Sequence, residues 1–393
     1  MSWPVVSLGE IFDIARGGSP RPIDAFITEE PDGVNWVMIG DASSGGKYIS
    51  STRKKIRKEG VPKSRMVYSG DFLLTNSMSF GRPYIMRTSG CIHDGWLVLK
   101  KKNASVDEEF FYHLLGSDLV YQEFSRRAAG ATVKNLNIDL VQKVEVVFPP
   151  LGEQKRIAAI LDKADALRAK RRKALEQLDA LAQAIFIEMF GDPLDGEFRW
   201  PTVSLQNLIE KESSICYGVV QPGNDDPDGV PLIRAGDLKD EILSCKGFKR
   251  ISKEVDEKHA RSKIQGDELL LSCVGNVGAV ALASKAIKGA NIARAVCRIP
   301  ASSLINRDYL AAYLRSPFSQ SYFQAQVRTV AQPTLNIKQI TELDVALPPL
   351  DAQEKFSRII GVIKEKRRLL EGNMKTLDAL FSSLQHRAFR GEL

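Results

Sequence analysis

The residues of this chain that could support chemistry are few and scattered. Asp139 followed by Glu153-Gln154-Lys155 has the acid and E-x-K spacing of a metal-dependent nuclease. The second half of the chain carries Ala352-Gln353-Glu354 at the equivalent place, so the pattern is not repeated there. Because Glu153 also falls at the start of a predicted helix, we do not expect a nuclease site.

Three further motifs lack groups that their chemistry needs. Gly45-Gly46-Lys47 is followed by Tyr48 in place of the Ser or Thr whose hydroxyl binds magnesium, which favours a turn over a phosphate loop. Cys91 and His93 supply only two of the ligands of a structural zinc site, which favours packing. Both Pro-Pro pairs are followed by Leu, so neither matches the [ND]PP[YF] loop of an adenine methyltransferase. We therefore expect no catalytic residue, no metal site and no cofactor bound by this chain.

Composition sets only broad limits on the kind of protein. The 393 residues have 44% hydrophobic content and a formal charge of +7, which is compatible with a polyanionic partner but does not require one. Five cysteines without CxxC spacing disfavour a disulfide framework. The sequence shows neither a signal peptide nor a membrane-spanning run, and the expected location is cytoplasmic.

A tandem repeat covers nearly the whole chain. Pro4-Val5-Val6-Ser7-Leu8 recurs as Pro201-Thr202-Val203-Ser204-Leu205, and Leu136-Asn137 recurs as Leu335-Asn336. Within each copy, short apolar runs separated by Gly and Ser predict strands, and residues 107–127 and 307–328 have helical spacing. The expected fold class is α+β, with two copies of one domain.

A long helix is predicted after each Pro-Pro pair, over residues 153–190 and 353–387. A heptad frame assigns two apolar stripes to each helix. The a positions are Ile157, Ala164, Arg171, Leu178 and Ile185 in the first helix and Phe356, Ile363, Leu370, Leu377 and Leu384 in the second. The d positions are Ile160, Leu167, Ala174, Leu181 and Glu188, then Ile359, Lys366, Asn373 and Leu380.

The two helices are expected to pair with each other as an antiparallel coiled coil. Residues 191–199 form a linker too short to carry the chain back along the first helix, so the second domain must begin near its far end. The predicted order is domain one at 1–148, a central spacer helix at 149–190, the linker at 191–199, domain two at 200–347, and a distal helix with a tail at 348–393. An approximate two-fold axis would relate the domains.

Basic clusters and polar loops are the candidate contacts to a nucleic acid. Basic clusters near residues 53–65 and 249–263 could bind phosphates, although a solvated basic face explains them almost as well. Three polar segments differ most between the copies and carry side chains that can read base edges, although neutral drift of loops gives the same pattern. The candidate DNA-binding residues are Arg16, Ser19, Arg21, Arg53, Lys54, Lys55, Arg82, Thr132, Lys134, Asn135, Gln221, Lys249, Arg250, Asn276, Gln332 and Thr334.

These features resemble the specificity subunit of type I restriction-modification systems. The matching features are the paired domains, Pro149-Pro150-Leu151 with Gln154, Pro348-Pro349-Leu350 with Gln353, and the closing Ala388-Phe389-Arg390-Gly391-Glu392-Leu393.

The resemblance implies a non-catalytic reader of double-stranded DNA. Each target-recognition domain would read one half of a bipartite asymmetric site, and the helices would set the gap and dock modification subunits. Those partners would carry S-adenosylmethionine and methylate adenine, and restriction subunits would add ATP- and Mg-dependent translocation and cleavage. The competing interpretations are an unrecognised enzyme and a duplicated coiled-coil scaffold that binds only protein.

Overall fold

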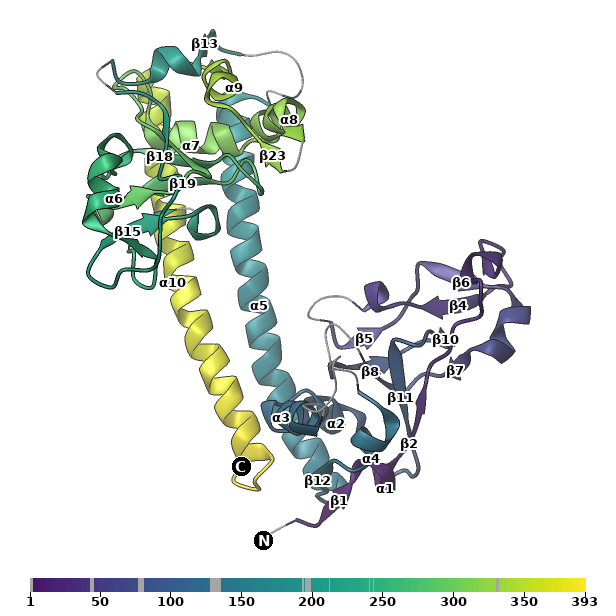
Figure 1. Ribbon diagram of the computed structural model, residues 1–393. Coiled ribbons are helices and arrows are strands. Elements are labelled where there is room, and N and C mark those ends of the chain that lie inside the picture. The colour runs from purple at the N-terminus through teal and green to yellow at the C-terminus, as the bar shows by residue number, and fades with distance from the viewer. Residues whose placement is uncertain are drawn as a thin grey trace. The chain divides into compact units, whose positions relative to one another are not determined.

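The chain folds into two compact units, which are described separately (Figure 1). The computed structural model describes residues 3–42, 46–76, 81–127, 136–192, 194, 199–211, 213–239, 241–242, 244–329 and 332–393. Unit 1 consists of Met1–Arg172 and Gly372–Leu393, and unit 2 of Lys173–Glu371. Each unit therefore holds one α+β domain, the first part of one long helix and the last part of the other.

Unit 1 is built from short strands followed by helices. The strands are β1 (Val5–Ser7), β2 (Phe12–Arg16), β3 (Ile27–Thr28), β4 (Val34–Val37), β5 (Tyr48–Ile49), β6 (Lys54–Ile56), β7 (Arg65–Val67), β8 (Phe72–Thr75), β9 (Pro83–Met86), β10 (Gly90–Ile92), β11 (Trp96–Lys101) and β12 (Glu145–Val147). The helices are α1 (Leu8–Ile11), α2 (Glu108–Leu115), α3 (Asp118–Arg127), α4 (Ile138–Gln142) and the start of α5 (Leu151–Phe190).

A central sheet of order β2-β11-β8-β9-β5 lies between two other layers in unit 1. Phe72 and Leu74 of β8 pack on the helical side with α2 and the long helices, whereas Leu73 packs on the opposite side with residues of the second sheet, β3-β6-β4-β10-β7. Successive strand side chains point to opposite faces, so a sheet covered on both sides needs an unbroken apolar run. Phe72–Thr75 is such a run and is buried throughout.

Unit 2 repeats this arrangement. Its strands are β13 (Thr202–Ser204), β14 (Cys216–Tyr217), β15 (Val230–Ile233), β16 (Glu241–Ile242), β17 (Arg250–Ile251), β18 (Leu269–Ser272), β19 (Val280–Ala283), β20 (Asn291–Ile292), β21 (Val296–Ile299), β22 (Arg328–Thr329), β23 (Pro333–Thr334) and β24 (Asp344–Ala346). Its helices are α6 (Lys253–Lys258), α7 (Arg307–Arg315), α8 (Pro317–Gln326), α9 (Ile337–Thr341) and most of α10 (Leu350–Ala388).

The strand orders confirm the α+β fold class and the duplication. The central sheet of unit 2 has the order β14-β21-β18-β19-β16, which matches that of unit 1 strand for strand. The first and last strands of each domain pair antiparallel, with Val5 opposite Val147 and Thr202 opposite Ala346. The second sheet differs, because unit 2 has three strands there, β17-β15-β20. Each stretch expected to be helical, 107–127 and 307–328, contains two helices, divided near Ser117 and Ser316.

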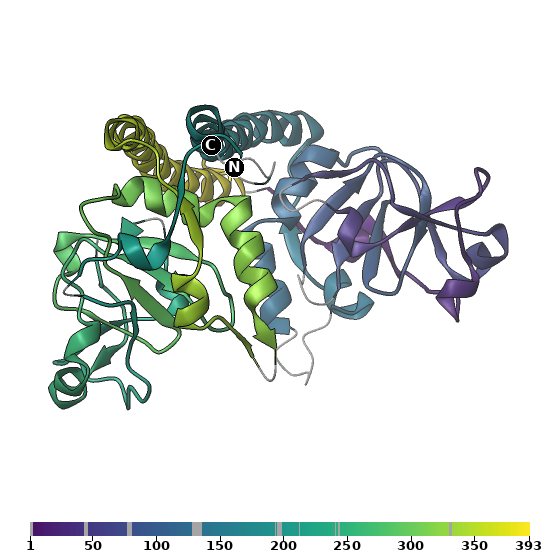
Figure 2. The ribbon, with the colours of Figure 1, turned by 90° about the horizontal axis from the view of Figure 1, so that it is seen from above.

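The long helices α5 and α10 confirm the expected pair and extend slightly beyond the predicted ends. In unit 1 the end of α10 packs against the start of α5, with Phe381 in the same core as Leu161. In unit 2 the start of α10 packs against the end of α5 (Figures 1 and 2), and the Phe186 and Phe356 rings lie 5.6 Å apart there. The pairing is therefore antiparallel within each unit.

The predicted d stripe is wrong by one residue in both helices. Leu167, Leu181 and Leu380 were assigned to the seam, yet they are 57%, 46% and 52% exposed. The second stripe of the seam consists instead of Leu161, Arg168, Leu175, Ala182 and Met189 in α5 and of Ile360, Arg367, Met374, Phe381 and Ala388 in α10, all buried or half-buried. Both registers offer apolar residues at helical spacing, so spacing alone does not separate them.

Each of these arginines is accommodated by an aspartate of the opposite helix. Arg168 Nε lies 2.7 Å from Asp378 Oδ1 in unit 1, and Arg367 Nη1 lies 3.4 Å from Asp179 Oδ1 in unit 2. The two pairs are copies related by a shift of 199 residues (367 − 168 = 378 − 179 = 199). A charge can occupy a helix seam when a partner and its hydrogen bonds replace the lost water.

The glutamine of each repeated Pro-Pro-Leu motif fastens a long helix to its own domain. Gln154 is fully buried; its Oε1 accepts from the Asp107 N–H at 2.8 Å, and its Nε2 donates to the Ser105 and Pro149 carbonyls. Gln353 is also fully buried and does the same with the Asn306 N–H and the Pro348 carbonyl. The motif therefore has a structural role at the start of each helix.

We expect Gln154→Leu to destabilise unit 1 by about 2–4 kcal/mol, because it leaves one buried carbonyl and a part-buried N–H and carbonyl without their partner. Chemical denaturation of the full chain measures the loss, and Gln353→Leu should shift the transition of unit 2 instead. Gln177→Leu, on the exposed face of α5, is the matched control and should change stability by less than about 0.5 kcal/mol. Equal effects of Gln154→Leu and Gln177→Leu would contradict the role of the buried amide.

Candidate nucleic-acid interface

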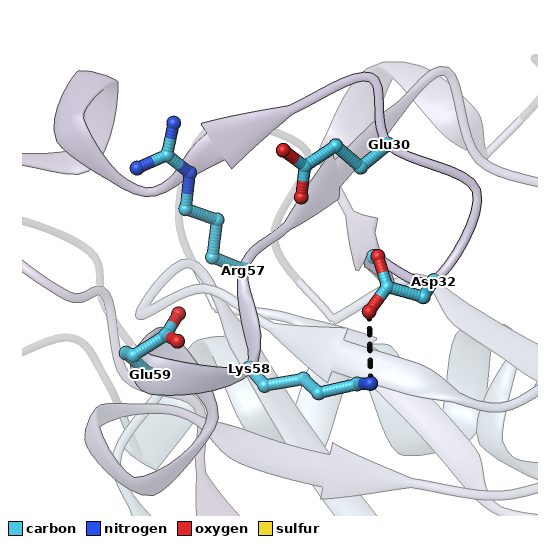
Figure 3. A pocket seen from close by; sticks show the side chains of 6 residues that line it. Glu30, Asp32, Arg57, Lys58 and Glu59 are labelled. Atoms are coloured by element: carbon cyan, nitrogen blue, oxygen red, sulfur yellow. Dashed lines mark hydrogen bonds and ion pairs between the residues drawn. The ribbon is translucent and has the colours of Figure 1, made fainter.

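The basic cluster of unit 1 is partly neutralised by neighbouring groups. Lys58 Nζ lies 2.9 Å from Asp32 Oδ2, and the two residues line a polar hollow with Glu30, Arg57 and Glu59 (Figure 3). The hydrogen bond and the opposite charges favour the charged form of both side chains. The pKa of Lys58 is therefore raised and the pKa of Asp32 is lowered. Figure 3 shows Arg57 pointing away from this pair.

Among the candidate cations of this cluster, Lys54 has the fewest polar side-chain contacts with described residues. Lys55 Nζ donates to the Pro31 carbonyl at 3.0 Å, and Arg53 Nη2 donates to the Gly40 carbonyl at 3.1 Å. Lys54 on β6 is exposed, and none of the contacts of the described residues engages its ammonium group. Lys54 is thus the residue here that can give its whole charge to a phosphate.

Lys249 and Arg250 hold the neighbouring loop of unit 2. Lys249 Nζ donates to the Gly223 carbonyl at 2.6 Å, and Arg250 Nε donates to the Gly229 carbonyl at 2.9 Å. Each side chain keeps further N–H groups that these bonds do not use. Their role in binding phosphate stays a prediction.

The polar segment 16–21 of unit 1 contacts the turn between β10 and β11. Arg16 Nε donates to the Asp94 carbonyl at 3.0 Å, and Ser19 Oγ donates to Asp94 Oδ1 at 2.9 Å. Arg21 lies 3.7 Å from the other carboxylate oxygen and remains 81% exposed. The hydrogen bond from Ser19 holds the pKa of Asp94 below its ordinary value. Three predicted contact residues therefore converge on Asp94, with Ser19 and Arg21 at its carboxylate and Arg16 at its backbone carbonyl.

Asn76, at the start of another predicted segment, reaches the same turn, and Leu136 contacts Asn76. The Asn76 N–H donates to the Gly95 carbonyl at 3.0 Å, and the Leu136 N–H donates to the Asn76 carbonyl at 3.1 Å. Thr132, Lys134 and Asn135 lie outside the described residues, in the segment that ends at Leu136. We call this assembly, residues 16–21, Asn76, 93–96 and Leu136, the loop cluster of unit 1.

Unit 2 builds the equivalent loop cluster, residues 217–221, Cys273, 293–296 and Leu335, with equivalent bonds. The Cys273 N–H donates to the Ala295 carbonyl, and the Leu335 N–H donates to the Cys273 carbonyl, at 2.8 and 2.9 Å. Tyr217 Oη also donates to the Leu335 carbonyl at 2.9 Å. Burial raises the pKa of Tyr217 to about 12, so the phenol remains a donor at neutral pH.

The two loop clusters share a backbone scaffold but differ in charge at the turn. Asp94 in unit 1 corresponds to Arg294 in unit 2, because Ile92 and Ile292 precede the turns in matched strands. Arg294 is exposed, and no hydrogen bond or ion pair among the described residues engages its side chain. Sequence reasoning missed both turns. Aligning Ile92 with Ile292 would have revealed them, because Asp94 and Arg294 then stand at the same position with opposite charges.

The other predicted residues surround the loop clusters. Arg82 is exposed, with its guanidinium 5.5 Å from the Tyr84 ring centre. Gln221, Asn276 and Gln332 are exposed in unit 2. Thr334 is half-buried on β23 and forms a β-bridge with Val274, which joins the 272–278 and 332–335 segments. Neighbouring loops therefore present most of the predicted side chains of unit 2.

Four of the residues first considered for chemistry, Cys91, His93, Glu153 and Lys47, have structural contacts. Cys91 is buried with its Sγ 3.4 Å from Met66 Sδ, and His93 Nδ1 accepts from the Gly95 N–H at 2.9 Å. Glu153 pairs with Arg156 at 2.6 Å, and Lys47 reaches Asp162 on α5 at 2.7 Å. Within the described ranges, no three His, Cys, Asp or Glu side chains gather as metal ligands would. No helix in those ranges carries an apolar stretch that would span a bilayer.

Two copies of one α+β domain, each with a rigid sheet and a chemically distinct loop cluster, define a tandem recognition protein. The family model of the type I restriction modification DNA specificity domain matches residues 1–177 and 202–377, and the chain belongs to that family.

Similar proteins support the same assignment over the full chain. The EcoBI specificity subunit of Escherichia coli is 27% identical, with 100% of this chain and 86% of the relative covered. The MjaIX specificity subunit of Methanocaldococcus jannaschii is 21% identical, with 100% and 93% covered. A solved structure of the type I restriction-modification system S subunit from M. genitalium has a TM-score of 0.52 at 15% identity, with 99% and 96% covered. A chain from a study of assembly and conformational transition of a type I system has a TM-score of 0.59 at 18% identity, with 100% and 98% covered.

Proposed function

We propose that each unit reads one half of a bipartite DNA site through its loop cluster, and that α5 and α10 set the gap between the halves. The observation that carries this proposal is the difference between the two loop clusters. The same backbone hydrogen bonds support both, yet Asp94 stands in one where Arg294 stands in the other. An acidic and a basic side chain select different base-edge groups in a groove, so one scaffold would read two different sequences.

The chain acts in this proposal as a non-catalytic subunit. Membership of the DNA specificity family supports a recognition role, and Cys91 and Glu153, first considered for chemistry, are engaged in packing and an ion pair. Methyl transfer with S-adenosylmethionine would belong to modification subunits docked on the helices. Cleavage with ATP and Mg would belong to restriction subunits.

Exchange of one domain tests the division of the site. Replacing residues 1–148 with the matching domain of a relative of different specificity should change one half-site and leave the other half-site and the gap unchanged. The measurement is the methylated-adenine motif in DNA of cells that carry the full system. Replacing residues 200–347 is the reciprocal control and should change the other half.

Changes in both halves after a single exchange would contradict the assignment of one half-site to each unit. An unchanged motif after both exchanges would favour a protein scaffold without DNA readout.

A further inference from the structure

A deep apolar pocket lies in unit 2 between the end of α5, the start of α10, and helices α7 and α8. Its volume is about 560 Å³. Ile187, Pro317 and Ile363 form the accessible apolar walls, whereas Asp179, Arg367 and Lys364 supply charge. Arg367 pairs with Asp179, and Lys364 Nζ lies 2.6 Å from Asp308 Oδ1, so these charges are balanced within unit 2.

The duplicated fold shows how unit 1 fills the corresponding place. Phe381 of α10 is only 9% exposed there and lies beneath Arg168, whose Cζ is 4.3 Å from the ring centre. His113 of α2 lies beside it, with the two ring centres 6.1 Å apart. Gln385 Nε2 also donates to the His113 carbonyl at 3.3 Å. An aromatic ring stacked on an arginine therefore occupies this place in unit 1.

Unit 2 keeps the arginine and aspartate but lacks the two rings. With the 199-residue shift, Arg168 and Asp378 correspond to Arg367 and Asp179, whereas Phe381 corresponds to Ala182 and His113 to Ala312. Ala182 and Ala312 both line the pocket. The space is present in unit 2 because alanines stand at the positions of Phe381 and His113.

An open apolar pocket of this kind leaves apolar surface in contact with water. An aromatic side chain would bury its surface against the half-buried Ile187 and Ile363. It would also gain about 0.5–2 kcal/mol from the Arg367 guanidinium if it stacks as Phe381 does on Arg168. Buried aromatic anchors in such pockets often dominate the binding energy of an interface.

We propose that this pocket receives an aromatic side chain of a modification subunit, seated against Arg367. The inference rests on the proposed function for the identity of the partner. The aromatic nature of the bound side chain is inferred from Phe381, which fills the corresponding place in unit 1.

The variant Ala182→Phe tests the pocket by filling it from within, as Phe381 does in unit 1. We expect the Kd of the full chain for its modification subunit to rise at least tenfold, while the midpoint of thermal unfolding does not fall and the half-site bound by unit 2 is unchanged. Ala180→Phe, on the exposed face of the same helix, is the matched control and should leave the Kd within about twofold.

A photo-reactive phenylalanine analogue in place of Ala312 gives an independent readout if Ala182→Phe fails to fold. The expected product in the assembled complex is a crosslink to the modification subunit. A crosslink within this chain, to a second copy, to a restriction subunit or to DNA, or no crosslink at all, would overturn the proposal. An unchanged Kd for Ala182→Phe in a folded chain would do the same. Domain exchange would still test DNA reading separately.

Discussion

A heptad added to both long helices should lengthen the gap between the half-sites and leave the half-sites themselves unchanged. The insertion repeats residues 173–179, Lys-Ala-Leu-Glu-Gln-Leu-Asp, after Arg172 and again after Glu371. These points are equivalent in the two copies and coincide with the boundary between the units. Seven residues keep the apolar seam in phase and add about 10 Å, or about three base pairs of B-DNA.

The original site should lose about 10³-fold in affinity, because both domains can no longer bind their halves together. Three base pairs also turn the second half-site by about 100° around the duplex, so the lengthened site should bind less tightly than the original site binds the unaltered chain. Selection of bound sequences from a random-gap DNA library measures both effects. A new half-site with the old gap would show that the helices do not set the spacing.

Arg294→Ala should weaken binding of the cognate site by about 10- to 200-fold, the range of one good arginine contact to a base. The expectation follows from its place at the turn of the loop cluster, where it is exposed and other described side chains leave its guanidinium unengaged. Titration of a labelled cognate duplex with the full chain and its modification subunits measures the change. Arg358→Ala removes the same charge from an exposed site on α10 and is the matched control.

Arg294→Lys separates base reading from a phosphate contact. A lysine cannot form the two parallel hydrogen bonds of an arginine. We therefore expect Arg294→Lys to bind the cognate site less than tenfold more tightly than Arg294→Ala. Full restoration would assign Arg294 to a phosphate. Equal affinities for Arg294→Ala and Arg358→Ala would remove Arg294 from the interface.

The sequence predicts the large elements well because their signals are local and repeated. Both long helices, the Pro-Pro boundaries before them and the α+β fold class follow from helix formers, breakers and the 199-residue shift. The seam was harder to predict. Leu167 has the right residue type and spacing, but the neighbouring Arg168 lies in the seam instead, where it meets Asp378 only after the chain has folded.

The binding surface could be predicted only in part. The segment 16–21 was identified from its polar composition, but its contact with Asp94 joins residues about 75 positions apart. Arg294 was missed because a single charged residue between two short strands has no motif of its own. Gln154 was noted as part of a repeated motif, and only its burial shows that it fastens helix to domain.

The division of the chain into units has a consequence for how the protein is made on the ribosome. Unit 2 is one continuous stretch, Lys173–Glu371, whereas unit 1 needs Gly372–Leu393 to complete its core. Phe381, Ala388 and Phe389 from that last stretch pack with Leu161, and the Phe389 and Phe110 rings lie 5.7 Å apart. The first domain is therefore expected to keep an exposed apolar surface until the last residues are synthesised, whereas unit 2 can complete its core earlier. The order of folding is expected to run opposite to the order of synthesis.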